Sequence, residues 1–325
     1  MKTRHVLVTG GAGFIGSHVC EALLAAGCRV TVIDDLSSGV KSNLPYHPKL
    51  NFQECDVLRN LPNHWPSDLD AIIHLAAIAS VAESWTALKR AHEVNVSSTV
   101  HLLEVSRRLG ISRFVLASSA AVYGNPGSVP LDETAPLSPL SPYGLHKLVS
   151  EQYGSLLSQE TGMTFVALRF FNVYGPRQLA SSPYSGVIAR FAEALRRRGP
   201  MTLRGDGRQT RDFVYVKDVA EAVVTAASVD LPKGTFIPIN IGSGHATSIL
   251  ELAETMRALY SDRSVPIIFE SLVPGEIRES CANIVRAQET LGLTPRWNLC
   301  EGLSELLLKG KAILMPFCHS LMPIS

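Results

Sequence analysis

The first half of the chain alternates short apolar runs, rich in β-branched residues, with stretches of helical periodicity. Apolar runs of this kind are typical of strands buried on both faces of a parallel sheet, and helices between them cover the sheet. The predicted strands are His5–Thr9, Arg29–Ile33, Leu50–Cys55, Ala71–Leu75, Phe114–Ala117 and Thr164–Leu168, with helices at Phe14–Ala26, Ala87–Leu109 and Tyr143–Glu160. We therefore expect an α/β fold, with a doubly wound parallel sheet of the Rossmann type over residues 1–175.

The pattern loosens after Pro176, where Pro and Gly separate the helical stretches. A smaller, loop-rich lobe is therefore expected over residues 176–310, and the family resemblance described below implies that it mainly binds substrate. Its predicted helices are Val187–Arg198, Lys217–Ser228, Ser248–Leu259 and Glu301–Lys309. The tail, residues 311–325, is apolar but contains Pro316 and Pro323, and its role is left open.

Charge and cysteine usage exclude several classes of function. Lys and Arg number 30 against 29 Asp and Glu, which gives a net charge of +1, and 46% of the residues are hydrophobic. This balance argues against disorder and against partners such as nucleic acid or anionic membranes. The six cysteines are scattered, without the Cys/His spacing of a zinc site, so no metal is expected. No apolar stretch reaches the roughly 18 residues of a membrane span, so we expect a cytoplasmic protein.

A glycine-rich segment joins the first predicted strand to the first predicted helix. Gly10, Gly13 and Gly16 form a GxxGxxG pattern. Glycine lets the backbone approach a pyrophosphate, and the helix N-terminus supplies N–H groups and a positive dipole end. Asp34, at the end of the second strand, suits hydrogen bonding to adenosine ribose hydroxyls and would repel a 2′-phosphate. The pattern favours NAD over NADP; the alternative is a tight turn followed by a surface aspartate.

A second group of residues suggests proton chemistry. Tyr143 and Lys147 are four residues apart on a predicted helix and share one face. An ordinary phenol has a pKa of about 10, and a nearby ammonium stabilises the phenolate. Ser119 follows the strand Phe114–Ala117 at a turn where ligands of such sheets bind, and its hydroxyl could hold a substrate oxygen. A Tyr and a Lys one turn apart usually mark a solvated face, but together with Ser119 and the glycine segment they indicate a catalytic site.

These motifs occur in one order along almost the whole chain. They read VTGGAGFIGSHV, IDDLSSG, ECDV, HLAA, LASSAAVYG, YGLHK, LRFFNVYGPRQ, GDGRQTRDFVYVKDVAEA and PGEIRES. From Val6 to about Leu308 the chain resembles an extended short-chain dehydrogenase/reductase of the NAD-dependent sugar epimerase/dehydratase family. The resemblance implies that Ser119, Tyr143 and Lys147 serve hydride transfer at a sugar carbon. It places along NAD the residues Gly10, Gly13, Phe14, Ile15, Gly16, Asp34, Asp56, Val57, Leu75, Ala76, Ala77, Asn95, Tyr143 and Lys147.

The residues before the VYG segment separate the branches of this family. Dehydratases carry Asp-Glu there and related decarboxylases carry Glu, whereas this chain has Ala120 and Ala121. Methyl groups transfer no protons, so elimination of water loses its usual acid and base. The block resembles the UDP-glucose 4-epimerase branch, which implies 4-epimerisation of a UDP-hexose through a 4-keto intermediate. The alternatives are a 4-keto reductase, dehydratase or decarboxylase of the same family, or a catalytically silent NAD-binding protein.

The resemblance also implies a set of substrate contacts. Arg211 matches the arginine of the RDF motif, for the substrate diphosphate. Many members carry another arginine where this chain has Val273; Arg278 either replaces it or pairs with a neighbouring carboxylate. Ser280 is small, which implies room for an N-acetyl group at the sugar 2-position. The full set is Ser80, Ser119, Tyr143, Asn172, Arg211, Arg278 and Ser280.

Assembly is the last property that the resemblance implies. The helices predicted at Ala87–Leu109 and Tyr143–Glu160 correspond to the pair that builds a four-helix interface in this family, so a symmetric homodimer is expected. The identity of the hexose, a nucleotide other than UDP and the pathway served are left open.

Overall fold

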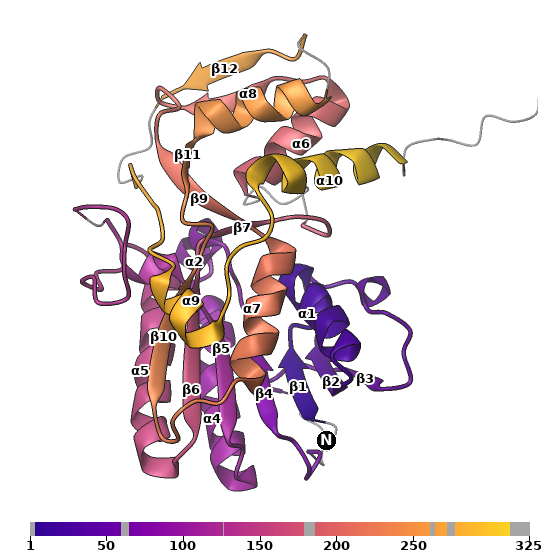
Figure 1. The fold of residues 1–325 in the computed structure, drawn as a ribbon, viewed down its shortest axis with the longest axis vertical. Coiled ribbons are helices and arrows are strands. Elements are labelled where there is room, and N and C mark those ends of the chain that lie inside the picture. Colours follow the sequence, from indigo (N-terminus) through magenta and orange to yellow (C-terminus); the bar gives the residue numbers. More distant parts are fainter. Residues whose placement is uncertain are drawn as a thin grey trace, which may run out of the picture.

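The central element of the protein is a sheet of seven parallel strands (Figure 1). The computed structural model describes residues 4–59, 65–125, 127–178, 186–260, 264–271 and 277–312. The strand order is β10-β6-β5-β4-β1-β2-β3, so the order reverses between β1 and β4. The strands are β1 (His5–Thr9), β2 (Arg29–Asp34), β3 (Leu50–Glu54), β4 (Ala71–His74), β5 (Arg113–Ser119), β6 (Thr164–Phe170) and β10 (Phe236–Ile241). This order confirms the doubly wound parallel sheet.

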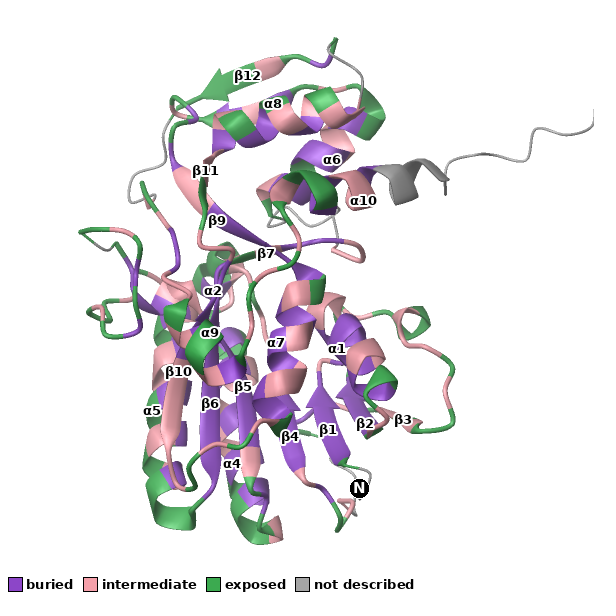
Figure 2. Cartoon of the chain, viewed as in Figure 1, coloured by how far each residue is buried: buried purple, intermediate pink, exposed green. Residues whose placement is uncertain are grey.

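Helices cover both faces of this sheet, and its strands are largely buried (Figure 2). One apolar cluster joins the sheet to α1 (Phe14–Ala25) and α7 (Val216–Ser228). The other joins it to α4 (Ser98–Leu109) and α5 (Pro142–Thr161). Because both faces are covered, the strands read as continuous apolar runs, which is what the sequence pattern predicts.

The helix that carries Tyr143 and Lys147 is defined by its ends and by one close approach. Ser141 caps α5 by accepting a hydrogen bond from the Gly144 N–H, Pro142 occupies the first turn, and Gly162 ends the helix at φ +73°. At Gly154 a Cβ would collide with the ring of Phe165 on β6. The absence of a side chain there lets α5 pack directly on the sheet and fixes its distance from the strands.

The long helix predicted over Ala87–Leu109 is divided in the structure. It consists of α3 (Leu88–His92), a π-helical turn over Glu93–Ser97 (η2) and α4. Asn95 lies in the π-helical turn, and its amide is hydrogen-bonded to the backbone of Ile78 at both N–H and C=O. The helix widens locally at this contact. Single π-helical turns of this kind are frequent at functional sites.

Residues from Asn172 onward form a second, smaller lobe and also return to the main sheet. A three-stranded sheet holds β7 (Asn172–Tyr174), β9 (Thr210–Tyr215) and β11 (Ala246–Ser248), and a two-stranded one holds β8 (Met201–Arg204) and β12 (Ile267–Glu270). Helices α6 (Val187–Arg197), α8 (Ile249–Tyr260) and α10 (Leu299–Ala312) pack around a separate apolar core. The predicted helices of this region are therefore confirmed. Helix α7 packs on the main sheet, and β10 is one of the strands of that sheet. The shorter elements are η1 (Lys41–Asn43), α2 (Val81–Thr86), η3 (Ala120–Val122) and α9 (Val285–Leu291).

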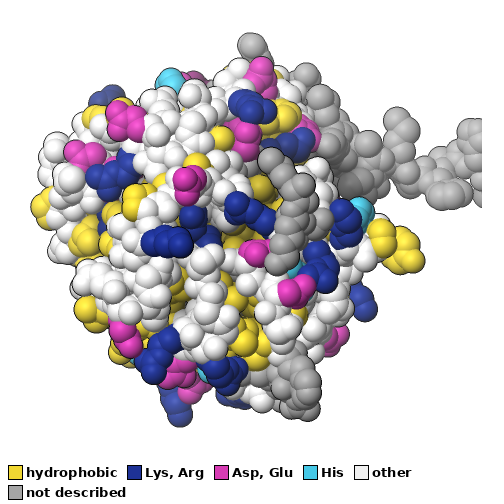
Figure 3. All heavy atoms as spheres, turned by 60° about the horizontal axis from the view of Figure 1, so that its bottom comes forward, with side chains coloured by type: hydrophobic (Ala, Val, Ile, Leu, Met, Phe, Trp, Pro, Cys, Tyr) yellow, Lys and Arg dark blue, Asp and Glu magenta, His cyan; other side chains and the backbone are white. Residues whose placement is uncertain are grey.

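Two predicted absences can be compared with the described residues. Among them, no group of three or more His, Cys, Asp or Glu side chains is placed to hold a metal ion. None of the helices in this part of the chain has the length and apolar character to span a bilayer. On the face shown in Figure 3, Lys and Arg side chains are interspersed with Asp and Glu. Pro316 and Pro323 of the tail lie outside the described residues, as does Val273.

Candidate active site

A cavity of about 810 Å³ lies at the carboxyl ends of the sheet strands and extends to the second lobe. Ligands of open α/β sheets bind where the strand order reverses, which here is between β1 and β4. The cavity lining contains most of the residues predicted from the sequence. They are Gly10, Gly13, Phe14, Ile15, Gly16, Asp34, Asp56, Val57, Leu75, Ala76, Ala77, Ser80, Ser119, Tyr143, Lys147, Asn172, Arg211 and Ser280.

The glycine segment brings bare backbone to the cavity wall. Gly10 has φ +70°, and a Cβ there would lie 2.6 Å from the backbone nitrogen of Ala76. A Cβ at Gly16 would collide with the carbonyl of Gly10. Helix α1 starts at Phe14 with Gly13 as its N-cap, and no side chain caps it. The helix N-terminus can therefore present its N–H groups to a phosphate, which fits a dinucleotide.

Asp34 ends β2 beside this segment and is 7% exposed. Its carboxylate accepts hydrogen bonds from the backbone N–H groups of Ala12 and Leu36, both at 2.9 Å. Burial raises the pKa of Asp34, and the two backbone donors oppose that shift. These contacts fix the carboxylate against the glycine segment, where it can accept hydrogen bonds from adenosine ribose hydroxyls and would repel a 2′-phosphate.

Replacement of Asp34 with alanine should weaken binding of NAD and relax the rejection of NADP. The variant loses a charge-assisted hydrogen bond and a repulsive charge, so NAD affinity should fall by roughly 10-fold to 10²-fold. Calorimetric titration of both cofactors measures the change. Asp132→Ala is a matched control, because Asp132 is exposed and lies outside the cavity lining. Unchanged discrimination between the two cofactors in the Asp34 variant would reduce Asp34 to a turn residue.

Ser119, Tyr143 and Lys147 meet at one wall of the cavity. Ser119 ends β5, and its hydroxyl forms a hydrogen bond with the Tyr143 phenol that lowers the pKa of Tyr143. Burial has the larger effect on Tyr143 and raises its pKa. The Nζ of Lys147 lies 5.8 Å from the centre of the Tyr143 ring. Lys147 is 3% exposed, and burial lowers its pKa to about 8.

The position of Tyr143 is fixed from the backbone side as well. Its N–H donates to the Ser84 hydroxyl at 3.1 Å, which ties α5 to α2. The Oγ of Ser119 accepts the Ala121 N–H at 3.1 Å and so starts the turn after β5. The combination of Ser119, Tyr143 and Lys147 can therefore hold an alcohol oxygen and exchange its proton.

Two predicted site residues lie off the cavity lining. Asn95 is 1% exposed, and its amide is occupied by the backbone of Ile78. It therefore supports the loop after β4 that carries Ala76 and Ala77. Arg278 is half exposed and pairs with Asp206 through Nη2 at 3.1 Å. The carboxylate that Arg278 contacts belongs to Asp206, which is not adjacent to it in sequence.

Arg211 and Ser280 reach the cavity from the second lobe. Nη1 of Arg211 donates to the carbonyls of Thr210 and Ile277, at 2.7 and 2.8 Å. Ser280 lies on the segment after Ile277. Hydrogen bonds hold this segment before Ser280, where the Arg278 carbonyl accepts the Thr210 N–H, and also after Ser280. Asp212 is fully buried and accepts the N–H of Ala282 at 3.0 Å.

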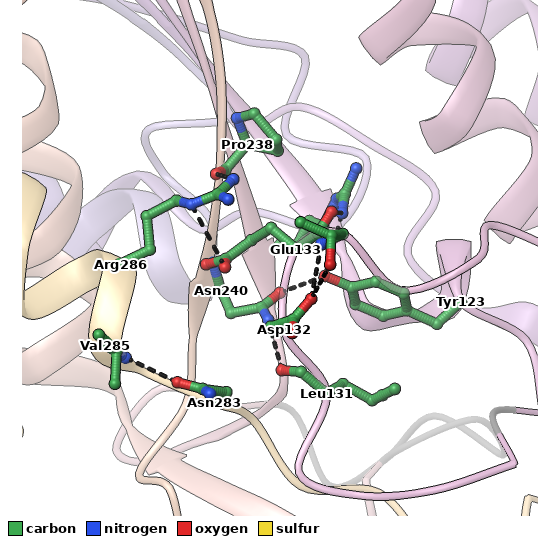
Figure 4. Close-up of polar contacts among 11 residues, drawn as sticks. Tyr123, Leu131, Asp132, Glu133, Pro238, Asn240, Asn283, Val285 and Arg286 are labelled. Carbon is green, nitrogen blue, oxygen red and sulfur yellow. Dashed lines mark hydrogen bonds and ion pairs between the residues drawn. The ribbon is translucent and has the colours of Figure 1, made fainter.

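Leu131 anchors the same segment from the opposite side. Its N–H donates to Cys281 O at 2.8 Å, and its carbonyl accepts the Asn283 N–H at 2.7 Å. The Asn240 amide also donates to the Leu131 carbonyl (Figure 4). Sequence reasoning missed these anchors, although Asp212 directly follows Arg211 in the RDF motif. It also missed several charged or polar residues of the lining, namely Glu83, Arg90, Gln178 and Glu279.

Comparison with known proteins identifies the family. The sequence model of the NAD dependent epimerase/dehydratase family matches residues 6–242. The chain belongs to this family. UDP-glucose 4-epimerase of Azospirillum brasilense is 35% identical over 314 residues, which cover 92% of this chain and 89% of that protein.

Solved structures of family members agree with the fold. The UDP-N-acetylglucosamine 4-epimerase from Methanobrevibacter ruminantium has a TM-score of 0.90 and 33% identity, covering 97% of this chain and all of that one. The Thermus thermophilus UDP-glucose 4-epimerase, in complex with NAD, has a TM-score of 0.84 and 33% identity, covering 94% of this chain and 99% of that one. The predictions of a Rossmann fold, of NAD as the cofactor and of an enzyme of the sugar-nucleotide epimerase group are confirmed for this epimerase/dehydratase family member.

Proposed function

We propose that this enzyme interconverts UDP-hexoses that differ in configuration at C4, through a 4-keto intermediate. The observation that carries the proposal is the wall of the cavity around Ser119. Tyr143 and Lys147 provide a proton-transfer pair there, while Ala120 and Ala121 line the same cavity. A dehydratase or a decarboxylase needs a further acid or base at this point, and alanine supplies neither.

The cavity residues can perform each proton-transfer and binding step of this reaction. The Lys147 ammonium favours the phenolate of Tyr143, which takes the proton of the 4-hydroxyl. Ser119 hydrogen-bonds the same oxygen and keeps it within reach of the phenolate. When bound, NAD supplies reversible hydride chemistry at C4. Tyr143 then returns its proton to the oxygen after the sugar has turned, while Arg211 and Asn172 retain the diphosphate.

The proposal extends to the sugar 2-substituent. Ser280 lines the cavity, and its small side chain leaves space that an aromatic residue would fill. The structural neighbour from Methanobrevibacter ruminantium is described as an epimerase of UDP-N-acetylglucosamine. We therefore include UDP-GlcNAc and UDP-GalNAc with UDP-glucose and UDP-galactose as substrates.

A panel of UDP-sugars, incubated without added cofactor and analysed by NMR, tests the function. We expect each active sugar to reach one equilibrium mixture of C4 epimers from either side. A product that forms only when NADH is added would indicate a 4-keto reductase. A 6-deoxy-4-keto product would indicate a dehydratase, a pentose product a decarboxylase, and no conversion of any sugar a silent NAD-binding protein.

We also propose that the enzyme is a symmetric homodimer. Helix α5 exposes Leu145, Tyr153 and Leu156, and the neighbouring α2 and α3 expose Trp85 and Leu88. Leu156 is 66% and Trp85 63% exposed, which is unusual for apolar side chains gathered on adjacent helices. Packing of this surface against its copy around a two-fold axis would remove it from water.

Leu156→Glu should convert the dimer to a monomer. The free-energy cost of burying an unpaired carboxylate at a two-fold interface exceeds the free energy that burial of one leucine contributes to dimerisation. Sedimentation across micromolar concentrations measures the mass. Phe269→Glu, at an exposed position of the second lobe, is the matched control and should leave the mass unchanged. A wild-type protein that sediments as a monomer at every concentration would contradict the proposal.

A cytoplasmic location is the remaining part of the proposal. Cys20, Cys28, Cys55, Cys281 and Cys300 are free thiols in the described part of the chain. Unpaired thiols at scattered positions are typical of proteins in reducing compartments.

A further inference from the structure

An ion pair between Glu151 and Arg169 lies behind the catalytic residues. Each side chain is 2% exposed. Nε of Arg169 donates to Oε1 of Glu151 at 3.1 Å, and Nη2 donates to Oε2 at 2.7 Å, so the contact is bidentate. Desolvation offsets most of what such a pair contributes to stability, and apolar replacements are often as stable. The pair therefore calls for an explanation beyond stability.

The carboxylate connects the two elements that carry the catalytic groups. Glu151 lies on α5, one helical turn beyond Lys147 and two beyond Tyr143. Its Oε1 also accepts a hydrogen bond from the hydroxyl of Ser118. Ser118 precedes Ser119 at the end of β5, so the carboxylate holds α5 and the Ser119 end of β5 together.

The guanidinium of Arg169 is fixed by partners of its own. Nη1 donates to the Tyr123 hydroxyl at 3.0 Å and to the Glu133 carbonyl at 3.2 Å. The guanidinium carbon lies 5.0 Å from the centre of the Tyr123 ring. The Tyr123 hydroxyl in turn donates to Asn240 at 2.6 Å (Figure 4). These contacts hold the Arg169 guanidinium, and its two hydrogen bonds to Glu151 orient that carboxylate.

Lys147 is buried, and burial disfavours its charge. The titratable side chains that interact with it are Tyr143, His146 and Glu151 on α5 and His74 on β4, while His92 contacts His146 and Arg169 contacts Glu151. Burial lowers the pKa of His74 to about 3, so His74 is neutral. Burial is also the main cause that lowers the pKa of His146, and the Lys147 charge adds to it. Glu151 carries the carboxylate among these side chains. Its negative charge raises the pKa of Lys147 and so opposes the lowering by burial.

We propose that Glu151 is a positioning residue of this site: its carboxylate, oriented by Arg169, supplies the counter-charge of the Lys147 ammonium and ties the Tyr143–Lys147 face of α5 to Ser119. The consequence for turnover rests on the proposed function. The effect on the charge of Lys147 does not, because it concerns the protein without substrate.

The first test measures the ionisation of Lys147 directly. The purified enzyme, with its bound cofactor, is labelled with ¹³C-lysine, and the Lys147 signal is assigned by its loss in Lys147→Met. Glu151 favours the charged form of Lys147, so Glu151→Gln should lower the pKa of Lys147, by about one unit or more. Glu160→Gln is the matched control, since Glu160 lies on the same helix and is 62% exposed. It should leave the titration unchanged.

The second test uses turnover. Loss of the Lys147 proton ends activity on the alkaline side, so that limb of the kcat profile should move to lower pH in Glu151→Gln. Ser118→Ala removes one hydrogen bond and no charge, so it should lower kcat without moving the limb. A residue with only a structural role would change kcat equally at every pH.

One further variant covers a failure of Glu151→Gln to fold, which an unpaired Arg169 could cause. Glu151→Gln with Arg169→Met removes both charges of the ion pair, so no guanidinium is left without its carboxylate, and the Lys147 pKa should shift in the same direction as in Glu151→Gln. An unchanged Lys147 titration in the folded variant would overturn the proposal, as would an equal shift in Glu160→Gln. If the wild type converts no UDP-sugar, the proposed function fails, and the lysine titration still decides the role of Glu151.

Discussion

Turnover is expected to fall by about 10²–10⁴-fold when Tyr143 is replaced with phenylalanine, the range typical of a lost general acid/base. The substitution removes only the ionisable oxygen. The ring contact with Lys147 and the backbone hydrogen bond to Ser84 remain, so the fold and the bound NAD should be retained. Initial rates with UDP-glucose measure the loss, and the absorbance spectrum of the purified protein reports the cofactor.

Tyr153→Phe is the matched control for this variant. Tyr153 lies on the same helix, but its side chain is 41% exposed and lies outside the cavity lining. It should retain wild-type kcat. Activity of Tyr143→Phe within a few-fold of wild type would remove Tyr143 from the chemistry.

Ser280→Tyr should lower kcat/KM for UDP-GlcNAc and UDP-GalNAc by about 10²-fold and spare UDP-glucose and UDP-galactose. A steric clash penalises only the larger ligand, and one misplaced group in a pocket changes discrimination by this order. The segment is held after Ser280 by Asp212 at Ala282 and by Leu131 at Cys281. Before Ser280 the Thr210 N–H donates to the Arg278 carbonyl, so the segment cannot easily move aside for the ring.

Ser280→Ala separates the hydroxyl of Ser280 from its size. It removes the oxygen and fills no space, so both pairs of sugars should keep their wild-type kcat/KM. Equal losses on both pairs in Ser280→Tyr would mean that this residue does not line the space around the 2-substituent.

The proximity of several predicted site residues follows from local spacing and from one rule of the fold. Tyr143 and Lys147 are adjacent because they are one helical turn apart. Gly10 and Asp34 meet because the first two strands are neighbours, and their carboxyl ends lie at one edge. Ser119 joins them because β5 is a neighbour of β4 in the same sheet.

The parts that the sequence does not predict are contacts between segments far apart in the chain. The resemblance places Asn95 along the cofactor, and in the structure its amide is hydrogen-bonded to Ile78 in a π-helical turn that periodicity does not reveal. Arg278 is paired with Asp206 from another loop. Glu151 has the position of an ordinary acidic residue on a helix, and only the packing of α5 on β6 shows that it pairs with Arg169.

The proposed reaction requires that the hydrogen at C4 leaves the sugar as a hydride and returns to the same sugar while it is bound to the enzyme. UDP-glucose carrying deuterium at C4 tests this claim when it is incubated with the enzyme in ordinary water and without added cofactor. We expect UDP-galactose that retains the deuterium at C4, because a hydride does not exchange with solvent, whereas the proton on Tyr143 does. UDP-galactose with protium at C4 would contradict it, since the epimerisation would then proceed through exchange of a proton with water.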